Sequence, residues 1–443
     1  MTFDKDIVAV ALGICKECGI DDARITLLRG IENSIVVDND RVDKLHQASS
    51  SSLYIQILVK QRYGAFSTNI MDPDVLRKFI RQAAESTAML TIDECMVLPD
   101  KALYYRGGGA DLKQYDPAIE TLSSETRIET AMNIGREVIG TDRRLLSVEA
   151  EYGDSVEYVY MADTQGFVGE SMLSNFSISA ECSIIGKGEE KPKEWWYEGS
   201  MFFDGLKKTG CGTMALERAL RRLKPVKLRS GKYNAVIENS VASKMVAPII
   251  SALNGAALQQ RNSFLIDSIG KKIFPAEMNL VDTPHLPGMM GSRYFDGEGV
   301  ATRNMSIIEH GVVNTYFINS YYGKKMGIQP TIEGPSVLKF AKDGDISGKE
   351  LSLAAIIKST ERGILITGFN GGNSNSATGD FSYGVQGFYF EHGEIVHPIR
   401  EMNITGNLIE LWSNLLLIGD DPRDCMRWQI PTLSFGNCVF NGI

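Results

Sequence analysis

The chain of 443 residues has little histidine, no clustered cysteine, no surplus of positive charge and no long apolar run. No apolar run approaches the roughly 20 residues of a membrane helix, which argues against a membrane protein. The formal net charge of −9 argues against a nucleic-acid partner, because phosphate binding needs clustered lysine and arginine. The first sixteen residues lack the basic start and apolar core of a signal peptide, so we expect a cytoplasmic protein.

The seven cysteines are too scattered for a disulfide framework, which agrees with a reducing compartment. Cys15 and Cys18 form a lone CxxC pair, and we interpret them as half-buried helix residues. Cys211 lies at the expected start of a helix, where the helix dipole would lower its pKa and make it a candidate nucleophile. No histidine lies near it in the sequence, and this weakens the candidate.

The chain has one basic cluster, which holds Arg218, Arg221, Arg222, Lys224, Lys227 and Arg229. This cluster covers the expected C-terminus of a helix and the linker that follows. Cations are favourable there because they complement the helix dipole. We therefore interpret the cluster as structural.

The length favours two domains. The polar, proline-containing residues 224–231 have the composition of a linker, so we predict an N-terminal domain over residues 1–223 and a C-terminal domain over residues 232–443. The first should combine helices with an antiparallel sheet, and the second should be rich in β-strands. Strands grouped apart from helices indicate the α+β class.

Local patterns predict several elements of the first domain. Asp72-Pro73 should begin a helix, because aspartate suits the N-cap and proline the first helical position. A second helix is expected over residues 124–140. Strands are expected at residues 147–152, 155–162 and 167–185, with a turn at Thr164-Gln165-Gly166.

The five histidines suggest turns and loops rather than catalysis. His310 and His392 each stand in a Glu-His-Gly triplet between apolar strands, where a residue before glycine often needs a positive φ. His285 follows a proline and His397 precedes one, so both are predicted in loops. Asp296-Gly297-Glu298-Gly299 could supply calcium ligands, but an Asp-Gly turn is the favoured interpretation.

The C-terminal half contains several glycine-punctuated segments whose order and spacing together resemble one family. The segments are RNSFLIDSIGKKIF from Arg261, FDGEGVATR from Phe295, TGDFSYGVQG from Thr378 and ITGNL from Ile404. They closely resemble the TldD/PmbA family, the modulator of DNA gyrase proteins. The resemblance implies a metallopeptidase-like C-terminal domain.

The resemblance also concerns the zinc site of the family. Its catalytic branch bears a helical HExxxH motif, and the matching stretch here has Ala247 and Ala252 at the histidine positions and Pro248 at the glutamate position. None of these side chains can coordinate zinc or accept a proton. Cys425 could match a third ligand of the family, but its flanking residues depart from that loop, and we interpret it as a loop cysteine. We therefore expect no catalytic residue, no metal site and no cofactor in this chain.

The resemblance implies a PmbA/TldE-type member, a non-catalytic subunit of a cytoplasmic TldD-type zinc metallopeptidase that processes unstructured peptides. Its partner would be an HExxxH-bearing TldD-type paralogue that holds the zinc, and the isolated chain could form a homodimer. Thr378, Gly379, Asp380 and Phe381 are candidates for a peptide-binding surface. A hairpin with buried aromatic side chains is an equally open interpretation of the same segment.

Two other functions stay open from the sequence. One is a homo-oligomeric peptide-binding or scaffold protein without a peptidase partner. The other is an enzyme with a metal-free site at Cys211 or Cys425. The natural complex's mass would identify the first, and the reaction of a thiol probe at neutral pH would identify the second.

Overall fold

The computed structural model describes residues 5–188, 190–341 and 351–442. In this part of the chain, two six-stranded sheets and one four-stranded sheet are packed with helices, so the fold is α+β as predicted. None of the helices in the described ranges has the length and apolar character of a membrane span.

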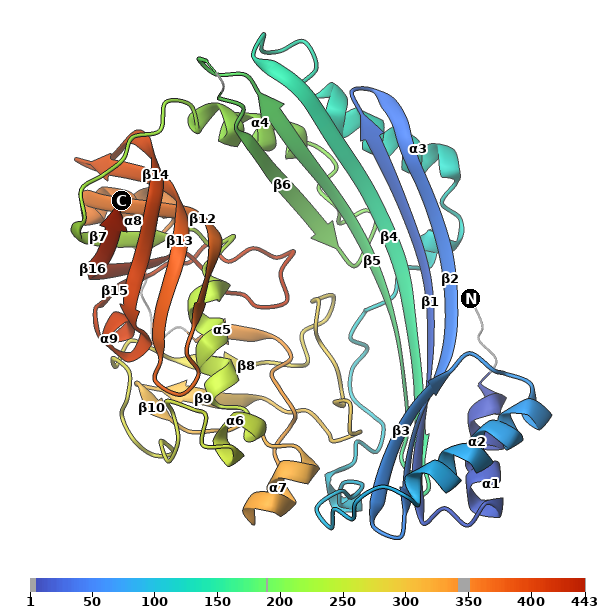
Figure 1. The fold of residues 1–443 in the computed structure, drawn as a ribbon. Helices are drawn as coiled ribbons and strands as arrows, with labels where there is room; N and C mark the ends of the chain where they lie inside the picture. The colour runs from blue at the N-terminus through green and yellow to red at the C-terminus, as the bar shows by residue number, and fades with distance from the viewer. Residues whose placement is uncertain (1–4, 189, 342–350, 443) are drawn as a thin grey trace.

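The first sheet is antiparallel and has the strand order β3-β2-β1-β4-β5-β6. Figure 1 shows its long strands curving into an arch on one side of the molecule. The strands are β1 (Asp22–Asp38), β2 (Arg41–Val59), β3 (Arg62–Thr68), β4 (Leu145–Asp163), β5 (Val168–Ile184) and β6 (Lys193–Ser200).

Four helices cover one face of this sheet. They are α1 (Asp6–Glu17), α2 (Pro73–Thr87), α3 (Ser124–Arg136) and α4 (Cys211–Arg221). Alternation along the strands supplies the buried face: Leu53, Ile55 and Ile57 of β2 lie in the core beneath α1 and α2, whereas the residues between them face the other way. The arch therefore presents its second face to the rest of the molecule.

The predicted helix starts are confirmed. The Asp72 side chain caps α2 by accepting from the backbone amides of Asp74 and Val75, and Pro73 is the first helical residue. Helix α3 begins at Ser124 as expected and ends at Arg136, four residues before the predicted end at Gly140.

The prediction of two strands at 147–152 and 155–162 was wrong, because β4 runs through them without a break. Gly153 pairs with Ser34 on one side and Ser177 on the other. Asp154 stays inside the strand because Asn33, Arg127 and Tyr152 donate to its buried carboxylate. The turn at Thr164–Gly166 is confirmed, with Gly166 at a φ of 97°.

The second half of the chain forms two sheets. The six-stranded one has the order β14-β13-β12-β7-β16-β15, and β14 also pairs with β16, so five strands close into a small barrel. Its strands are β7 (Gly231–Ile237), β12 (Arg362–Ser374), β13 (Asp380–Glu391), β14 (Glu394–Asn407), β15 (Leu415–Ile418) and β16 (Leu433–Gly442). The four-stranded sheet, in the order β10-β9-β8-β11, contains β8 (Leu280–Asp282), β9 (Met305–Glu309), β10 (Val312–Val313) and β11 (Leu338–Phe340).

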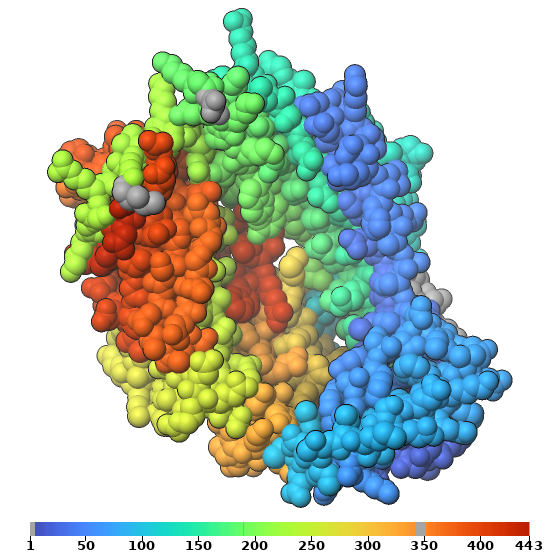
Figure 2. Space-filling view, in the orientation of Figure 1, coloured from blue at the N-terminus to red at the C-terminus, as the bar shows by residue number. Residues whose placement is uncertain are grey.

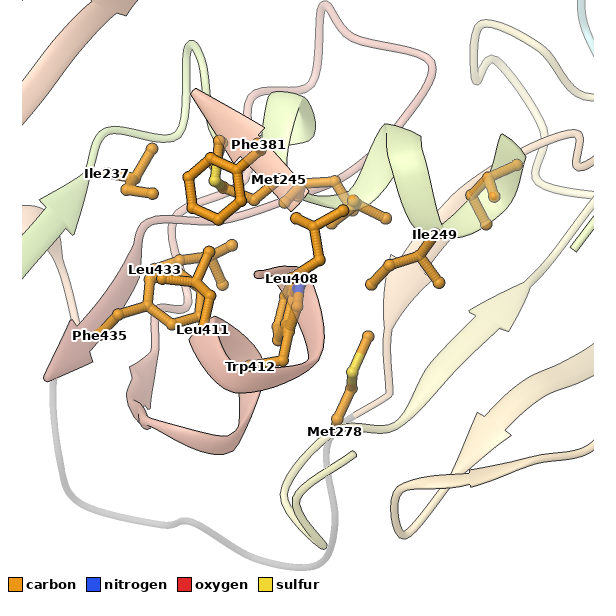
Figure 3. Close-up of a cluster of buried hydrophobic side chains, with 14 of the residues drawn as sticks. Ile237, Met245, Ile249, Met278, Phe381, Leu408, Leu411, Trp412, Leu433 and Phe435 are labelled. Atoms are coloured by element: carbon orange, nitrogen blue, oxygen red, sulfur yellow. The ribbon is translucent and has the colours of Figure 1, made fainter. Parts of the chain in front are cut away.

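Five helices accompany these sheets: α5 (Ser243–Ala252), α6 (Gly255–Gln259), α7 (Ser320–Met326), α8 (Leu353–Thr360) and α9 (Leu408–Ser413). Figure 3 shows the core that joins α5 and α9, in which Met245 and Ile249 of α5 lie near Leu408, Leu411 and Trp412 of α9. All five side chains are buried, so α5 is held by apolar packing.

The strands of the first sheet end at Ser200, and those of the other sheets begin at Gly231. The exact division at residues 224–231 stays a prediction. Arg218 and Arg222 of the basic cluster do more than complement the helix dipole, because they bond across this junction to Glu238 at 2.9 Å and to Gln386 at 3.0 Å. Figure 2 shows a hollow between the arch and the second half of the molecule.

Candidate functional site

Helix α5 carries Ala247, Pro248 and Ala252, the residues that the resemblance assigns to the zinc-motif positions. Asn239 and Ser240 form a turn, and the helix begins at Ser243. Pro248 lies inside the helix, where it lacks the amide hydrogen that would bond to the preceding turn. Ala252 is fully buried and Ala247 half-buried.

The donor set of α5 does not fit a zinc ion. Zinc takes nitrogen, thiolate or carboxylate ligands, whereas Ala247, Pro248 and Ala252 offer only carbon atoms. Across residues 5–188, 190–341 and 351–442, no three histidine, cysteine, aspartate or glutamate side chains are grouped so that they could hold a metal ion.

The segment Thr378–Asp380 forms a tightly bonded turn before β13. Thr378 Oγ1 donates to Asp380 at 2.7 Å, and the Asn407 amide donates to the Thr378 carbonyl at 2.8 Å and to Asp380 at 3.0 Å. The hydrogen bond from Asn407 lowers the pKa of Asp380 below its usual value. Gly379 adopts a φ of 80°, which glycine tolerates best.

Phe381 differs from its neighbours because its side chain is only 5% exposed. It points into the hydrophobic cluster of Figure 3 and stacks on Tyr383 at a centroid distance of 5.3 Å. Its ring thus belongs to the core, whereas Thr378 and Asp380 are exposed. A peptide contact at these two exposed residues stays a prediction.

A pocket of about 710 Å³ lies beside the start of α5, where the two halves of the molecule meet. Its lining includes Ser243 of α5, Tyr197 of β6, Pro335, Arg427 and Trp428. Strand β6 is the last strand of the first sheet in the described part of the chain, and it pairs with β5 alone. The pocket thus borders a sheet edge, the kind of surface to which an extended peptide can add as a strand.

Arg423 links this sheet edge to the second half of the molecule. Its guanidinium lies 3.9 Å from the ring centroid of Trp196 and 4.4 Å from that of Tyr197. It also donates to the Tyr197 carbonyl oxygen and lies 3.6 Å from a carboxylate oxygen of Glu198. The side chain is 8% exposed, so these contacts are shielded from water.

The structure weakens Cys211 further as a candidate nucleophile. Cys211 is the first residue of α4, but it is 1% exposed, and burial raises the pKa of its thiol to about 12. Its sulfur donates to the Trp196 carbonyl oxygen. Cys425 lies in a loop as predicted, and burial raises its pKa as well.

The histidine turns were predicted well. His310 and His392 take φ values of 47° and 54° at the tips of the β9–β10 and β13–β14 hairpins. His285 lies in a loop as expected. The loop prediction for His397 was wrong, because it lies within β14 and stacks on Tyr389.

The Asp-Gly turn at residues 296–299 is confirmed. Asp296 Oδ1 accepts from the amides of Glu298 at 2.9 Å and Val300 at 3.0 Å, and the Gly299 amide donates to the Asp296 carbonyl. Burial raises the pKa of Asp296 to about 6. The carboxylate thus serves the turn.

No sequence pattern indicated the contacts made by the irregular segment between α2 and α3. The Tyr105 amide donates to the Gly299 carbonyl at 3.0 Å, and the Tyr105 ring stacks on Tyr294 at 5.2 Å. The Asp93 carboxylate accepts from the Tyr321 hydroxyl at 2.9 Å. These contacts join the two halves of the molecule.

The chain matches two family models. Residues 230–442 match the PmbA/TldA metallopeptidase C-terminal domain, and residues 23–87 match PmbA/TldA metallopeptidase domain 1. A metalloprotease PmbA homologue from Haemophilus influenzae is 27% identical over 421 residues, which is 94% of this chain and 91% of the relative. The metalloprotease PmbA of Escherichia coli O157:H7 is 26% identical and covers 90% of this chain and 88% of its own length.

Solved structures share the whole architecture. A proposed modulator of DNA gyrase from Bacteroides thetaiotaomicron is 42% identical, covers 100% of both chains and has a TM-score of 0.96. TldE from Thermococcus kodakarensis, at 19% identity, covers 99% of both chains with a TM-score of 0.85, which shows the common fold. Together with the family models, this likeness over the full length shows that the chain belongs to the TldD/PmbA family of metallopeptidase-related proteins.

Proposed function

We propose that this chain is a non-catalytic, PmbA/TldE-type subunit that works with an HExxxH-bearing TldD-type paralogue in a cytoplasmic zinc metallopeptidase. The proposal depends on the composition of α5, where we match Ala247, Pro248 and Ala252 to the positions of the zinc ligands and the base. The helix packs into the core through Met245, Ile249 and Ala252, within a family of metallopeptidase-related proteins.

The contribution of this subunit would be to hold an unstructured peptide while the partner supplies zinc and base. The hollow between the arch and the second half of the molecule supports this role, because β6 offers a strand edge beside the pocket at Tyr197 and Trp428. An extended chain can add to such an edge, whereas a folded protein has its strands already paired. The substrates would therefore be unfolded peptides.

Two alternatives are weaker. A metal-free enzyme at Cys211 gains no support, because a buried thiol with a pKa near 12 is protonated at neutral pH. A homo-oligomeric scaffold would need the same peptide-binding surface but no paralogue. The peptidase subunit and the homo-oligomeric scaffold differ in one respect: only the first becomes part of an active peptidase when the paralogue is added.

The test is hydrolysis of a fluorogenic unstructured peptide by this chain, by the paralogue from the same cell and by their mixture. We expect negligible hydrolysis by this chain and chelator-sensitive hydrolysis by the mixture. Hydrolysis by this chain alone that resists chelators and disappears in Cys211→Ala would contradict the proposal and favour the cysteine enzyme. A mixture no more active than the paralogue alone would favour the scaffold.

A further inference from the structure

A second pocket, of about 650 Å³, lies between the first sheet and the second half of the molecule, away from α5. We call it the tyrosine pocket because Tyr54, Tyr63, Tyr321 and Tyr322 line it. These rings come from both halves, two from the sheet and two from α7. The pocket is therefore formed by the junction of the two halves.

The strand register builds the sheet side of this pocket. Arg24, Thr26 and Leu28 alternate along β1 and point to the face opposite α1 and α2, while Ile25 and Leu27 lie in the core. Their neighbours on β2 and β4 include Tyr54 beside Thr26 and Val159 beside Leu28, and both also line the pocket. The sheet side thus combines an apolar area, formed by Leu28, Val159 and Met161, with polar side chains that include Asp22, Gln56 and the buried Arg24.

That arginine keeps an unused donor. Arg24 is 2% exposed, and its Nη2 donates to Asp163 at 2.9 Å and to the Tyr104 hydroxyl at 3.4 Å. Its Nε is buried and has no acceptor among the described residues. An unpaired buried donor costs free energy, so an acceptor brought by a ligand would bind there favourably.

On the opposite side, Glu298 presents a carboxylate whose bonds come from Ser320. One of its oxygens accepts from the Ser320 amide at 2.8 Å, and Arg24 attracts its charge, but no basic side chain in the described ranges lies within ion-pair distance of it. Burial raises the pKa of Glu298. Glu333 also lines the pocket, but Arg293 lies 3.4 Å from it and partly balances its charge. A cation beside Glu298 would relieve the cost of burying this carboxylate.

We propose that the tyrosine pocket binds the amino-terminal residue of an extended peptide. The α-ammonium group lies at Glu298 and against the tyrosine rings of α7, where cation–π attraction adds to the ion pair. The first side chain, which is apolar, packs on Leu28, Val159 and Met161 of the sheet. A peptide carbonyl oxygen accepts from Arg24.

This assignment of the tyrosine pocket deepens the proposed function. It rests on that function in one respect, namely that the ligand is a peptide. The ligand must have three properties. A positive charge matches Glu298, a hydrogen-bond acceptor matches Arg24, and an apolar part matches the surface of the sheet. A free anion would meet Glu298 and Glu333, and a bare metal ion would leave the apolar surface and the Arg24 donor unused. A peptide amino terminus satisfies all three.

The test compares two ten-residue peptides that begin with leucine, continue with glycine and serine and carry fluorescein at the carboxyl end. One has a free amino terminus and the other is acetylated. Fluorescence anisotropy with the full chain should show that acetylation weakens binding at least about tenfold. Glu298→Gln, which keeps an oxygen for the Ser320 amide, should weaken binding of the free peptide to the level of the acetylated one. Glu129→Gln, an exposed change on α3, is the matched control and should leave both affinities unchanged.

Equal affinity of the wild-type chain for the two peptides would overturn the tyrosine pocket as the site of the amino terminus. So would a Glu298→Gln chain that keeps the wild-type melting temperature and the preference for the free peptide. If neither peptide binds while the mixed subunits still hydrolyse peptides, the pocket proposal fails and the proposed function stands. If the mixed subunits do not hydrolyse peptides but this chain still prefers the free amino terminus, the proposed function fails and the pocket proposal stands.

Discussion

The contact between Arg423 and β6 is the sharpest place to perturb the junction between the two halves. In Arg423→Ala, the guanidinium leaves the rings of Trp196 and Tyr197, and the Tyr197 carbonyl and Glu198 lose their partner. Each desolvated cation–π contact contributes up to about 2 kcal/mol, and a hydrogen bond from a charged donor about 1.5–3 kcal/mol. These contributions overlap, because one group makes all of them, so we expect a total loss of about 3 kcal/mol.

The assay is urea unfolding followed by tryptophan fluorescence, which reports on this region because Trp195, Trp196 and Trp428 lie near the junction. With a urea slope of about 3 kcal/mol/M, the midpoint of the transition that reports the junction should fall by about 1 M. Arg423→Lys should give an intermediate loss, because an ammonium group keeps the charge but not the planar donor geometry.

Arg221→Ala is the matched control, since its only ion pair is an exposed one to Glu217 at 3.9 Å in the described part of the chain. That change should cost no more than about 0.5 kcal/mol. If the free energies of unfolding of Arg423→Ala and Arg221→Ala differ by less than about 0.5 kcal/mol, the junction does not depend on Arg423 and the reasoning fails.

Three further changes test separate parts of the structure. Phe381→Ala should lower the free energy of unfolding by about 3–5 kcal/mol because it opens a cavity in the core, whereas the exposed Asp380→Asn should cost under about 1 kcal/mol; equal effects in urea would refute the buried position of the ring. Gly379→Ala should lower the free energy of unfolding by about 1–2 kcal/mol, because its φ is 80° and the new methyl group would lie 3.2 Å from Phe264. The control is Gly334→Ala, whose methyl group would meet no atom within 4 Å and which should cost about 1 kcal/mol less in the same assay. Burial raises the pKa of Cys15, Cys182, Cys211 and Cys438 to about 12, so a thiol reagent at pH 8 should label only Cys18, Cys95 and Cys425 in the native chain and all seven after unfolding. The buried thiols stabilise the folded chain while they are protonated, and this contribution should be lost as the pH rises from about 9 towards 12. Rapid labelling of Cys211 in the native chain at pH 8 would contradict its buried position.

Elements controlled by neighbouring residues could be predicted from the sequence. The start of α2 depends on Asp72 and Pro73 alone, and the turns at His310 and His392 depend on the glycine that follows each histidine. Local rules are enough in such cases because capping and φ preference act over two or three residues.

Features that depend on distant residues could not be predicted. Separate strands were predicted at residues 147–152 and 155–162, but Asn33 and Arg127, far away in the sequence, hold Asp154 inside one continuous β4. The tyrosine pocket needs the register of β1 with β2 and the docking of α7, and Arg423 reaches a strand more than two hundred residues earlier. The pKa of Cys211 follows burial beneath other elements, which outweighs the helix dipole that its sequence position suggests.

The central claim is that this chain joins a metal-bearing partner and contributes no zinc ligand of its own. Native mass spectrometry of the complex isolated from its own cells tests it most directly, because it gives the subunits and the zinc content together. We predict a complex of this chain with an HExxxH-bearing paralogue, in which zinc remains with the paralogue when the subunits are separated. A complex made only of copies of this chain, or zinc that stays with this chain after separation, would contradict the account.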